Sequence, residues 1–352
     1  MFPFLKKNLI GVDVGTYSLK VVKLKGGPGS YTLEAAACVK LPNDVLENRS
    51  IASGFLAEVI RSQRVSGKRA AAILAGSSLA FRHMYLPVMP EKDLREAIRW
   101  EIRKEIAFPA NELVCDYVVS GVAPQAAGKG EGTKNQMSLT VFAALKKDVE
   151  SLMTLFSGAG LDLRLVEVAP TALLSVFDMN NDWDGHNYAM LEIGDTSSIL
   201  AIFRERRLEF ARELGYGGAD ITNAVALALN KGHDEAQEYK HAYGLGQKEG
   251  FDKDAKKAIA ASIEGLCSEI HRSFDYYQAQ YRGGTVSKLF LSGGTARLAG
   301  IVDMMTGVLG ISTFVHDPFR KVRVPKKLDD ETLRSVAPCL NVATGLAGRT
   351  GG

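Results

Sequence analysis

Two short loops in this chain carry residue types suited to binding phosphate. The first lies in IGVDVGTYSLKVVKL, residues 10–24, where Gly15, Thr16 and Ser18 separate two apolar runs. Glycine lets the backbone approach a ligand, and successive N–H groups at such a turn form a concave nest for anions. The hydroxyls add further donors, so the loop suits phosphate oxygens, although ordinary hairpin turns use the same residue types.

Two charged side chains accompany this first loop. Asp13 ends the first apolar run, where a carboxylate could hold Mg²⁺ directly or through its waters, as the ion usually accompanies nucleotide phosphates. Lys20 could neutralise phosphate charge, and it equally fits a solvated lysine on a strand. The sequence therefore offers Asp13 as a metal ligand and leaves two interpretations of Lys20 open.

A second loop of the same kind lies in YAMLEIGDTSSILAIF, residues 188–203, again with a glycine and hydroxyls between two apolar runs. Gly194 comes 179 residues after Gly15 (194 minus 15), which is about half the chain. A repeat of this period indicates two similar domains, each opening with a β-hairpin. If the two loops face each other, they could hold a phosphate chain from both sides.

A third candidate element is SKLFLSGGTARLAGIVDMM, residues 287–305, an apolar strand followed by Gly293 and Gly294. We expect a helix directly after the glycine pair, because a strand-to-helix junction brings backbone N–H groups and a helix N-terminus to a ligand. Three apolar residues of that helix would share one face: Leu298, Ile301 and Met304. Other sequence motifs for nucleotide binding are absent: no GxxxxGK[ST] occurs, and GLGQKEG has the wrong spacing for GxGxxG.

Composition and charge exclude several classes of protein. The 352 residues suffice for about two domains, and the contents of 46% hydrophobic and 24% charged residues are ordinary for a globular protein. A net charge of +3 is too weak to indicate nucleic-acid binding, and no apolar window is long enough for a transmembrane helix. The four cysteines form no CxxC pair, which disfavours a zinc site or disulfide framework and favours a reducing, cytoplasmic setting.

Strand and helix patterns alternate along the chain and predict an α/β fold. Residues 91–106 predict an amphipathic helix, because apolar residues recur at every fourth position: Leu94, Ile98, Ile102 and Ile106. Residues 121–136 lack any hydrophobic period and read as a hairpin tip. The polar interval NNDWDG, residues 180–185, marks the main domain boundary.

The two hairpin loops and the Gly-Gly turn together resemble those of the actin, Hsp70 and sugar-kinase superfamily. In that resemblance VDVGTYSLK is the first phosphate loop, EIGDTSS the second, and LSGGTARLAG the motif on the adenosine side. The resemblance covers nearly the whole chain. It implies an α/β fold of duplicated actin-like, or ribonuclease H-like, domains that bind ATP with Mg²⁺.

Within the superfamily, residues 86–119 are similar to the small inserted α+β subdomain of the type IV pilus assembly protein PilM family. The shared pattern is a Met-Pro lead, an "AI.WE" helix, "I.FP" and then "DY". HDPFRKVRVPKKLD and NVATGLAGR resemble that family's C-terminal region. The implied domains are 1–80 (domain 1A), 81–145 (inserted subdomain 1C), 146–186 (1A continued), 187–330 (domain 2, with 2B at about 217–270) and 331–352 (return to 1A).

The resemblance also assigns site residues. Phosphate contacts would fall on Gly15, Thr16, Ser18 and Lys20 in the first loop and on Gly194, Asp195, Thr196 and Ser197 in the second. The α-phosphate and sugar would be bordered by Gly293, Gly294 and Thr295, and the nucleoside by Glu238 and Lys240. The segment that holds the last two equally fits a charged, exposed helix. Asp13 and, as a second candidate, Glu192 would serve Mg²⁺.

Two departures from the superfamily bear on catalysis. Glu192 stands where many members have Asp, which leaves the metal geometry open. Aligned on Pro170, Ala169 stands where filament-forming relatives carry a Glu or Gln that positions the attacking water, although Glu167 could substitute. Such a group is typically worth around 10² to 10⁴ in rate, so we expect ATP binding with weak or no turnover.

The implied role is that of a cytoplasmic adaptor in type IV pilus biogenesis and twitching motility. The expected partner is the N-terminal cytoplasmic tail of PilN, with indirect links to PilO and the pilus motor ATPases. The membrane would be reached only through that partner, no nucleic acid is expected, and a homo-oligomer stays open. The alternatives are a sugar-kinase-like phosphotransferase, for which no aspartate base motif is found, and an FtsA-like filament-forming protein.

Overall fold

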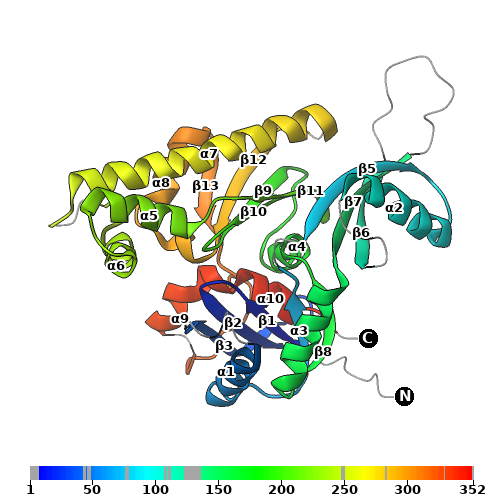
Figure 1. Ribbon diagram of the computed structural model, residues 1–352, viewed down its shortest axis with the longest axis horizontal. Helices are drawn as coiled ribbons and strands as arrows, with labels where there is room; N and C mark the ends of the chain where they lie inside the picture. Colours follow the sequence, from blue (N-terminus) through cyan, green and yellow to red (C-terminus); the bar gives the residue numbers. More distant parts are fainter. Residues whose placement is uncertain are drawn as a thin grey trace.

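The computed structural model shows three β-sheets within the part of the chain that it describes (Figure 1). The described residues are 8–42, 45, 49–75, 79–106, 109, 112–122, 136–246, 250–281, 284–328 and 330–350. Two five-stranded sheets form the two halves of the molecule. A three-stranded sheet with one helix lies at the side, in cyan and teal in Figure 1.

The first five-stranded sheet contains the predicted first hairpin. Its strands are β1 (Ile10–Val14), β2 (Ser18–Lys25), β3 (Thr32–Lys40), β4 (Arg69–Ile73) and β8 (Asp162–Glu167). They lie in the order β3-β2-β1-β4-β8. β1 pairs antiparallel with β2 and parallel with β4. The sheet is therefore mixed, antiparallel on the side of the hairpin and parallel on the other side of β1.

Helices cover both faces of this sheet, because alternate residues of each strand point to opposite sides. These helices are α1 (Arg49–Ser62) and α3 (Lys146–Gly158) on one face and α4 (Ala169–Asn180) and α10 (Asn341–Ala347) on the other. Ile10 and Val12 pack with α1 and α3. Val22 and Leu24 pack with α10. The sheet is therefore buried between two apolar layers.

The second five-stranded sheet repeats this arrangement. Its strands are β9 (Asn187–Ile193), β10 (Ser198–Arg204), β11 (Arg207–Leu214), β12 (Val286–Ser292) and β13 (Ser312–Val315). They lie in the order β11-β10-β9-β12-β13, and β9 pairs antiparallel with β10 and parallel with β12. The strand order thus matches the first sheet, as the repeated loops predict.

Further helices cover one face of the second sheet, and α4 covers the other. The covering helices are α5 (Gly218–Leu229), α6 (His233–Tyr243), α7 (Lys253–Tyr281) and α8 (Ile301–Leu309). On the opposite face, Phe177 of α4 packs with Phe203 and Phe290, at ring-centroid distances of 5.6 and 5.2 Å. Because α4 also packs against α10, it joins the cores of the two halves.

The third sheet forms the small unit inserted between β4 and α3. Its elements are β5 (Ala80–Pro87), α2 (Glu91–Glu105), β6 (Leu113–Val122) and β7 (Gln136–Leu145), with the strands in the order β5-β7-β6. The apolar stripe of α2 packs on Leu139 and Val141 of β7, which confirms the predicted amphipathic helix. The predicted tip at 121–136 falls largely on residues 123–135, which lie outside the described residues. The finer division of the chain into five segments stays a prediction.

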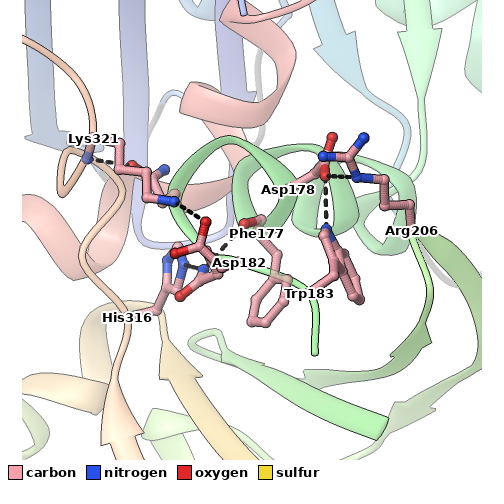
Figure 2. Close-up of polar contacts among 9 residues, drawn as sticks. Phe177, Asp178, Asp182, Trp183, Arg206, His316 and Lys321 are labelled. Carbon is pink, nitrogen blue, oxygen red and sulfur yellow. Dashed lines mark hydrogen bonds and ion pairs between the residues drawn. The ribbon is translucent and has the colours of Figure 1, made fainter. Parts of the chain in front are cut away.

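Exposed polar contacts hold the segment that leads from α4 to β9 (Figure 2). Asp178 accepts a hydrogen bond from Trp183 Nε1 at 2.8 Å and pairs with Arg206, whose Nε lies 2.9 Å from its Oδ1. Asp182 Oδ1 lies 2.7 Å from Lys321 Nζ. Exposed ion pairs of this kind add little to the free energy of unfolding. Their main effect is to hold the segment between α4 and β9 in place.

A buried hydrogen-bond chain centred on His316 lies beside this segment. Burial lowers the pKa of His316 to about 4, so its ring is neutral. Its Nε2 accepts from Asn181 Nδ2 at 2.9 Å, and its Nδ1 donates to Asn341 Oδ1 at 2.6 Å. Asn341 Nδ2 in turn donates to the carbonyl of Pro338 at 3.0 Å. The chain links the end of β13 to α4, to α10 and to the short helix η2 (Ala337–Leu340).

Two glycines let α10 lie directly on its neighbours. A Cβ at Gly11 of β1 would lie 2.0 Å from the Ala343 carbonyl oxygen, and one at Gly345 of α10 would lie 2.0 Å from the Ala172 carbonyl oxygen. Backbone on both sides leaves no room for a methyl group. Glycine is therefore required where α10 is pressed between β1 and α4.

Candidate functional site

The first predicted loop is a tight turn between β1 and β2. The Gly15 N–H donates to the Ser18 carbonyl at 3.1 Å, which closes the turn. Thr16 is exposed at its tip, and the Ser18 side chain is buried. A Cβ at Gly15 would lie 2.7 Å from Lys20 Nζ, so the glycine leaves space for that ammonium group beside the turn.

Lys20 forms an ion pair behind this loop. Asp13 and Lys20 face each other in the β1–β2 register, and Asp13 Oδ2 lies 3.1 Å from Lys20 Nζ. Burial alone would lower the pKa of Lys20, but its interactions with Asp13 and with Glu192, which is ionised at the high pH where Lys20 titrates, raise the pKa to about 12. The structure therefore places Lys20 as a largely buried cation paired with Asp13 rather than as a solvated strand lysine.

The second loop has the same closure as the first. The Gly194 N–H donates to the Ser197 carbonyl at 3.0 Å, and Thr196 is exposed at the tip as Thr16 is in the first loop. The Ser197 hydroxyl donates to Glu213 Oε1 at 2.8 Å, so a neighbouring strand orients it. Two hairpin turns of the same geometry thus stand 179 residues apart.

Glu192 occupies in β9 the position that Asp13 occupies in β1, since both lie two residues before the loop glycine. Burial raises the pKa of Glu192 to about 8, against the opposing effects of the Ser292 hydroxyl and Lys20. The Ser292 hydroxyl donates to its Oε2. Without a bound cation, burial therefore favours the neutral form of Glu192 at neutral pH.

The start of α5 belongs to the same place and was missed by the sequence analysis. The Gly218 N–H donates to the Gly194 carbonyl at 2.8 Å, and the Ala219 N–H donates to the Asp195 carbonyl at 2.8 Å. A Cβ at Gly217 would lie 2.3 Å from the Asp195 carbonyl oxygen. A glycine pair after a strand, as in GYGGAD, was the signal that could have found it.

Gly218 also brings two predicted residues together. A Cβ at Gly218 would lie 2.6 Å from Thr295 Oγ1 and 3.5 Å from Lys240 Nζ. Lys240 donates to the Gly218 carbonyl at 2.9 Å and to Thr222 Oγ1 at 2.7 Å. Burial lowers the pKa of Lys240 to about 8, with Asp195 opposing the shift. The second loop, Lys240 and Thr295, which were predicted separately, therefore meet at the start of α5.

Glu238, predicted together with Lys240, lies on the exposed side of α6. The residue of that helix that is buried beside Lys240 is Gln237, whose Oε1 accepts from Thr222 Oγ1. The helix therefore contributes a buried lysine and a buried amide to the α5 start. The exposed carboxylate of Glu238 takes no part in that hydrogen-bond network.

The third motif needs a correction. The expected helix does not follow the glycine pair directly: residues 294–297 form the short 3₁₀ helix η1 (Gly294–Arg297), and α8 begins only at Ile301. Leu298 therefore lies before α8. Gly293 has φ of +90° and a Cβ there would lie 2.3 Å from the Ile193 carbonyl oxygen, so the chain turns sharply at the end of β12 and needs glycine there.

The residues near the start of α4 do not supply an obvious water-activating group. Ala169 is the first residue of α4 and packs among apolar side chains. The Glu167 carboxylate accepts from Thr171 Oγ1 at 3.0 Å and pairs with Arg349, whose Nε lies 2.7 Å from its Oε1. Glu167, considered above as a substitute, is thus already engaged by two partners.

The described residues contain neither a metal-binding cluster nor a membrane-spanning helix. Over the ranges given above, no group of three or more His, Cys, Asp or Glu residues is arranged to hold a metal ion. No helix among those same residues is long and apolar enough to span a membrane.

The donor set fits the phosphates of a nucleotide. Backbone turns at Gly15 and Gly194 carry exposed hydroxyls, and Lys20 and Lys240 supply cationic groups behind them. Glycine at Gly218 keeps open the space that a Cβ would fill. Hydrogen-bond donors and buried cations in this arrangement favour an anionic ligand over a neutral one.

Comparison with known proteins shows which family and which solved structures this chain is similar to. The family model described as "Type IV pilus assembly protein PilM" matches residues 11–351. A solved "PilM-PilN type IV pilus biogenesis complex" is similar with a TM-score of 0.84 and 26% identity, over 97% of this chain and 98% of that one. The cell division protein FtsA of Enterococcus hirae is 22% identical over 88% of this chain and 78% of its own length.

A fourth comparison concerns the fold alone. MreB 5 of Spiroplasma citri, solved bound to AMPPNP, is similar with a TM-score of 0.52 at 11% identity, over 96% of this chain and 94% of that one. Together with the matching strand orders of the two halves, this confirms the duplicated actin-like α/β fold. Since the family model spans nearly all of the sequence, the chain belongs to the type IV pilus assembly protein PilM family.

Proposed function

We propose that this protein is an ATP-binding adaptor of the type IV pilus assembly platform that binds the N-terminal cytoplasmic segment of PilN. The proposal that the protein binds ATP rests on the pair of loops at Gly15 and Gly194, which are closed by the same kind of hydrogen bond. The proposal that it binds PilN is supported by family membership and by the similarity to a solved PilM-PilN complex.

ATP would be held by the two loops and by the α5 start. Thr16 and Thr196 would donate from the loop tips, while Lys20 and Lys240 would balance the phosphate charge. Thr295, 8% exposed, would border the sugar side. AMPPNP in a solved protein of the same fold supports this class of ligand. Mg²⁺, when bound, would neutralise part of the phosphate charge, with Asp13 as the first candidate to face it and Glu192 as the second.

We further propose that the protein turns ATP over weakly or not at all. Ala169 has no group to orient a water, and Glu167 is held by Arg349 and Thr171. Losing a group that orients the nucleophile costs around 10² to 10⁴ in rate. Bound ATP would then serve to favour one relative orientation of the two halves.

The adaptor would act at the cytoplasmic face of the inner membrane, reached through PilN. Links to PilO and to the pilus motor ATPases would be indirect, and twitching motility would depend on them. A homo-oligomer is compatible with this role.

The test measures both ligands on the full chain. ATP binding with Mg²⁺ is measured by calorimetry, and a fluorescent peptide of the PilN N-terminal segment is titrated with and without nucleotide. A scrambled peptide of the same composition is the control. We expect saturable binding of ATP and of the native peptide only, and failure of the peptide to bind in either nucleotide state would overturn the adaptor proposal.

Two further outcomes would favour the alternatives. Sedimentable polymers that appear with ATP would favour a filament-forming role, which the similarity to FtsA keeps open. ATP consumption that depends on an added sugar would favour a kinase.

A further inference from the structure

Lys40 lies beside the first loop, although the ligand set proposed above does not include it. It is the last residue of β3 and lies directly opposite Ser18 in the β2–β3 register. The next N–H along the chain, that of Leu41, donates to the Tyr17 carbonyl at 2.9 Å. The end of β3 is therefore fixed to the tip of the first loop.

Lys40 lies on the face of the sheet that carries the charged residues of the first loop. Residues directly opposite each other in a sheet point to the same face, and so do residues two apart along a strand. Asp13 is opposite Lys20, and Lys20 lies two residues from Ser18, which is opposite Lys40. This face therefore carries an ion pair behind the loop and an exposed lysine at the loop itself.

The lysines near the loops differ in what holds their ammonium groups. Lys20 pairs with Asp13, and Lys240 donates to two oxygen acceptors. Lys40 Nζ lies 5.4 Å from the centroid of the Tyr17 ring, and no carboxylate among the described residues forms an ion pair with it. A cation–π contact at an exposed site is weak compared with a charge-assisted hydrogen bond. Lys40 therefore holds the positive charge that can most easily change its partner.

We propose that Lys40 binds the phosphate chain of the nucleotide at the first loop, where its ammonium group leaves the Tyr17 ring for a phosphate oxygen. The exchange is favourable because an ammonium group gains a charge-assisted hydrogen bond. This inference rests on the proposed function, since its ligand is the nucleotide proposed above. It adds a cation that the loop motif does not contain, because Lys40 belongs to the next strand.

The charge of the ligand decides how much Lys40 contributes to binding. ATP carries one phosphate more than ADP and therefore more negative charge, whereas adenosine carries none. Because Coulomb attraction grows with the charge of the ligand, Lys40 should favour ATP over ADP and should have no effect on adenosine. A general distortion of the site would instead weaken the binding of all three ligands.

Two lysines at opposite ends of one hairpin allow a matched comparison. Lys40→Met removes the charge and keeps an unbranched side chain beside the loop. Lys25→Met is the control, at the far end of β2 and about 23 Å from the loop at about 3.3 Å per residue. Both lysines are exposed, so neither substitution opens a cavity. Lys40→Arg keeps the positive charge and should keep most of the affinity.

Calorimetric titration of the full-length variants measures the Kd for ATP, ADP and adenosine. We expect Lys40→Met to weaken ATP binding about tenfold, equivalent to roughly 1.4 kcal/mol, and ADP binding by less. Its affinity for adenosine should not change, and Lys25→Met should bind all three ligands as the natural sequence does. Equal losses for ATP and adenosine, or an unchanged affinity for ATP, would overturn the role of Lys40.

A second measurement uses the natural sequence, so it does not depend on the folding of any variant. Exposed amines are acetylated with acetic anhydride in the presence and absence of ATP, and the modified lysines are mapped by mass spectrometry. We expect ATP to slow the acetylation of Lys40 at least about threefold and to leave that of Lys25 unchanged, since a phosphate oxygen shields only the first amine. Equal acetylation of Lys40 with and without ATP would contradict the contact.

The same acetylation with tripolyphosphate separates this inference from the proposed function. Failure of the natural sequence to bind ATP would overturn the proposed function. Protection of Lys40 by tripolyphosphate would then still support a phosphate contact at this lysine. Absence of protection by both ligands would overturn that contact as well.

Discussion

Asp13 and Lys20 lie opposite each other across the first hairpin, with 3.1 Å between Asp13 Oδ2 and Lys20 Nζ. Their side chains are only 13% and 14% exposed, so each charge depends on the other for compensation. Glu192, the counterpart of Asp13 in the other half, acts on the same ammonium group. The ammonium group of Lys20 therefore compensates Asp13 directly and also senses the charge of Glu192 in the other half when Glu192 is ionised.

Asp13→Asn should destabilise the protein by about 1–3 kcal/mol, because a partly buried ammonium group loses its main partner. Urea unfolding at neutral pH measures the loss. The matched control is Asp162→Asn, whose pair with Arg164 is about half exposed on both side chains and is worth at most about 1 kcal/mol. Equal losses in the two variants would show that Asp13 and Lys20 are not energetically coupled.

Gly218→Ala should lower ATP affinity about tenfold, or roughly 1.4 kcal/mol, because its Cβ would lie 2.6 Å from Thr295 Oγ1. The same change at Gly307 in α8, where a Cβ would meet nothing within 4 Å, should leave the affinity unchanged. Calorimetric titration of both variants, with circular dichroism to confirm folding, compares them directly. Unaltered affinity in Gly218→Ala would remove the α5 start from the binding site.

Gly345→Ala and Gly54→Ala are the same substitution inside a helix and should have opposite effects on the free energy of unfolding. A Cβ at Gly345 would lie 2.0 Å from the Ala172 carbonyl oxygen, whereas one at Gly54 in α1 would meet nothing within 4 Å. We expect a loss of about 1–3 kcal/mol or more for Gly345→Ala. Gly54→Ala should instead gain up to about 1 kcal/mol from helix propensity. Thermal unfolding of both variants measures these changes in stability. An increase in the stability of Gly345→Ala would contradict the tight packing of α10.

His316 should make the protein sensitive to mild acid. Burial lowers its pKa from 6.5 to about 4, so between these values the unfolded state binds a proton that the folded state refuses. Stability from this group is complete above pH 6.5 and is lost as the pH falls toward 4. The loss amounts to roughly 3 kcal/mol by pH 4, at about 1.4 kcal/mol per pKa unit.

The variant His316→Gln should therefore show a flatter dependence of the free energy of unfolding on pH between 4 and 6.5. It should also be less stable at pH 7, because the hydrogen bonds to Asn181 and Asn341 are disturbed. His186→Gln, at an exposed histidine of the segment before β9, is the control and should keep the slope of the natural sequence. Parallel pH profiles for the two variants would count against His316 as the titrating group.

The local patterns of the sequence were enough to predict both hairpin loops, their repeat, the amphipathic helix α2 and the family. Each of these depends on residues that are close together in the chain: a glycine between apolar runs, or apolar residues four apart. The actin-like fold followed from their resemblance to a known superfamily, because the loops and the Gly-Gly turn are short motifs in a set order. The register of Asp13 opposite Lys20 also follows once the turn is a hairpin.

Only the tertiary structure decided which groups meet. The partners of Lys240, the effect of Glu192 on Lys20, the place of the Gly217–Gly218 pair and the 3₁₀ turn after Gly293 all depend on segments that are distant in sequence. Burial and charge at such places are set by neighbours from other elements, so composition and spacing do not report them. The sequence alone therefore identified the two loops, while folding selected the lysines and glycines that surround them.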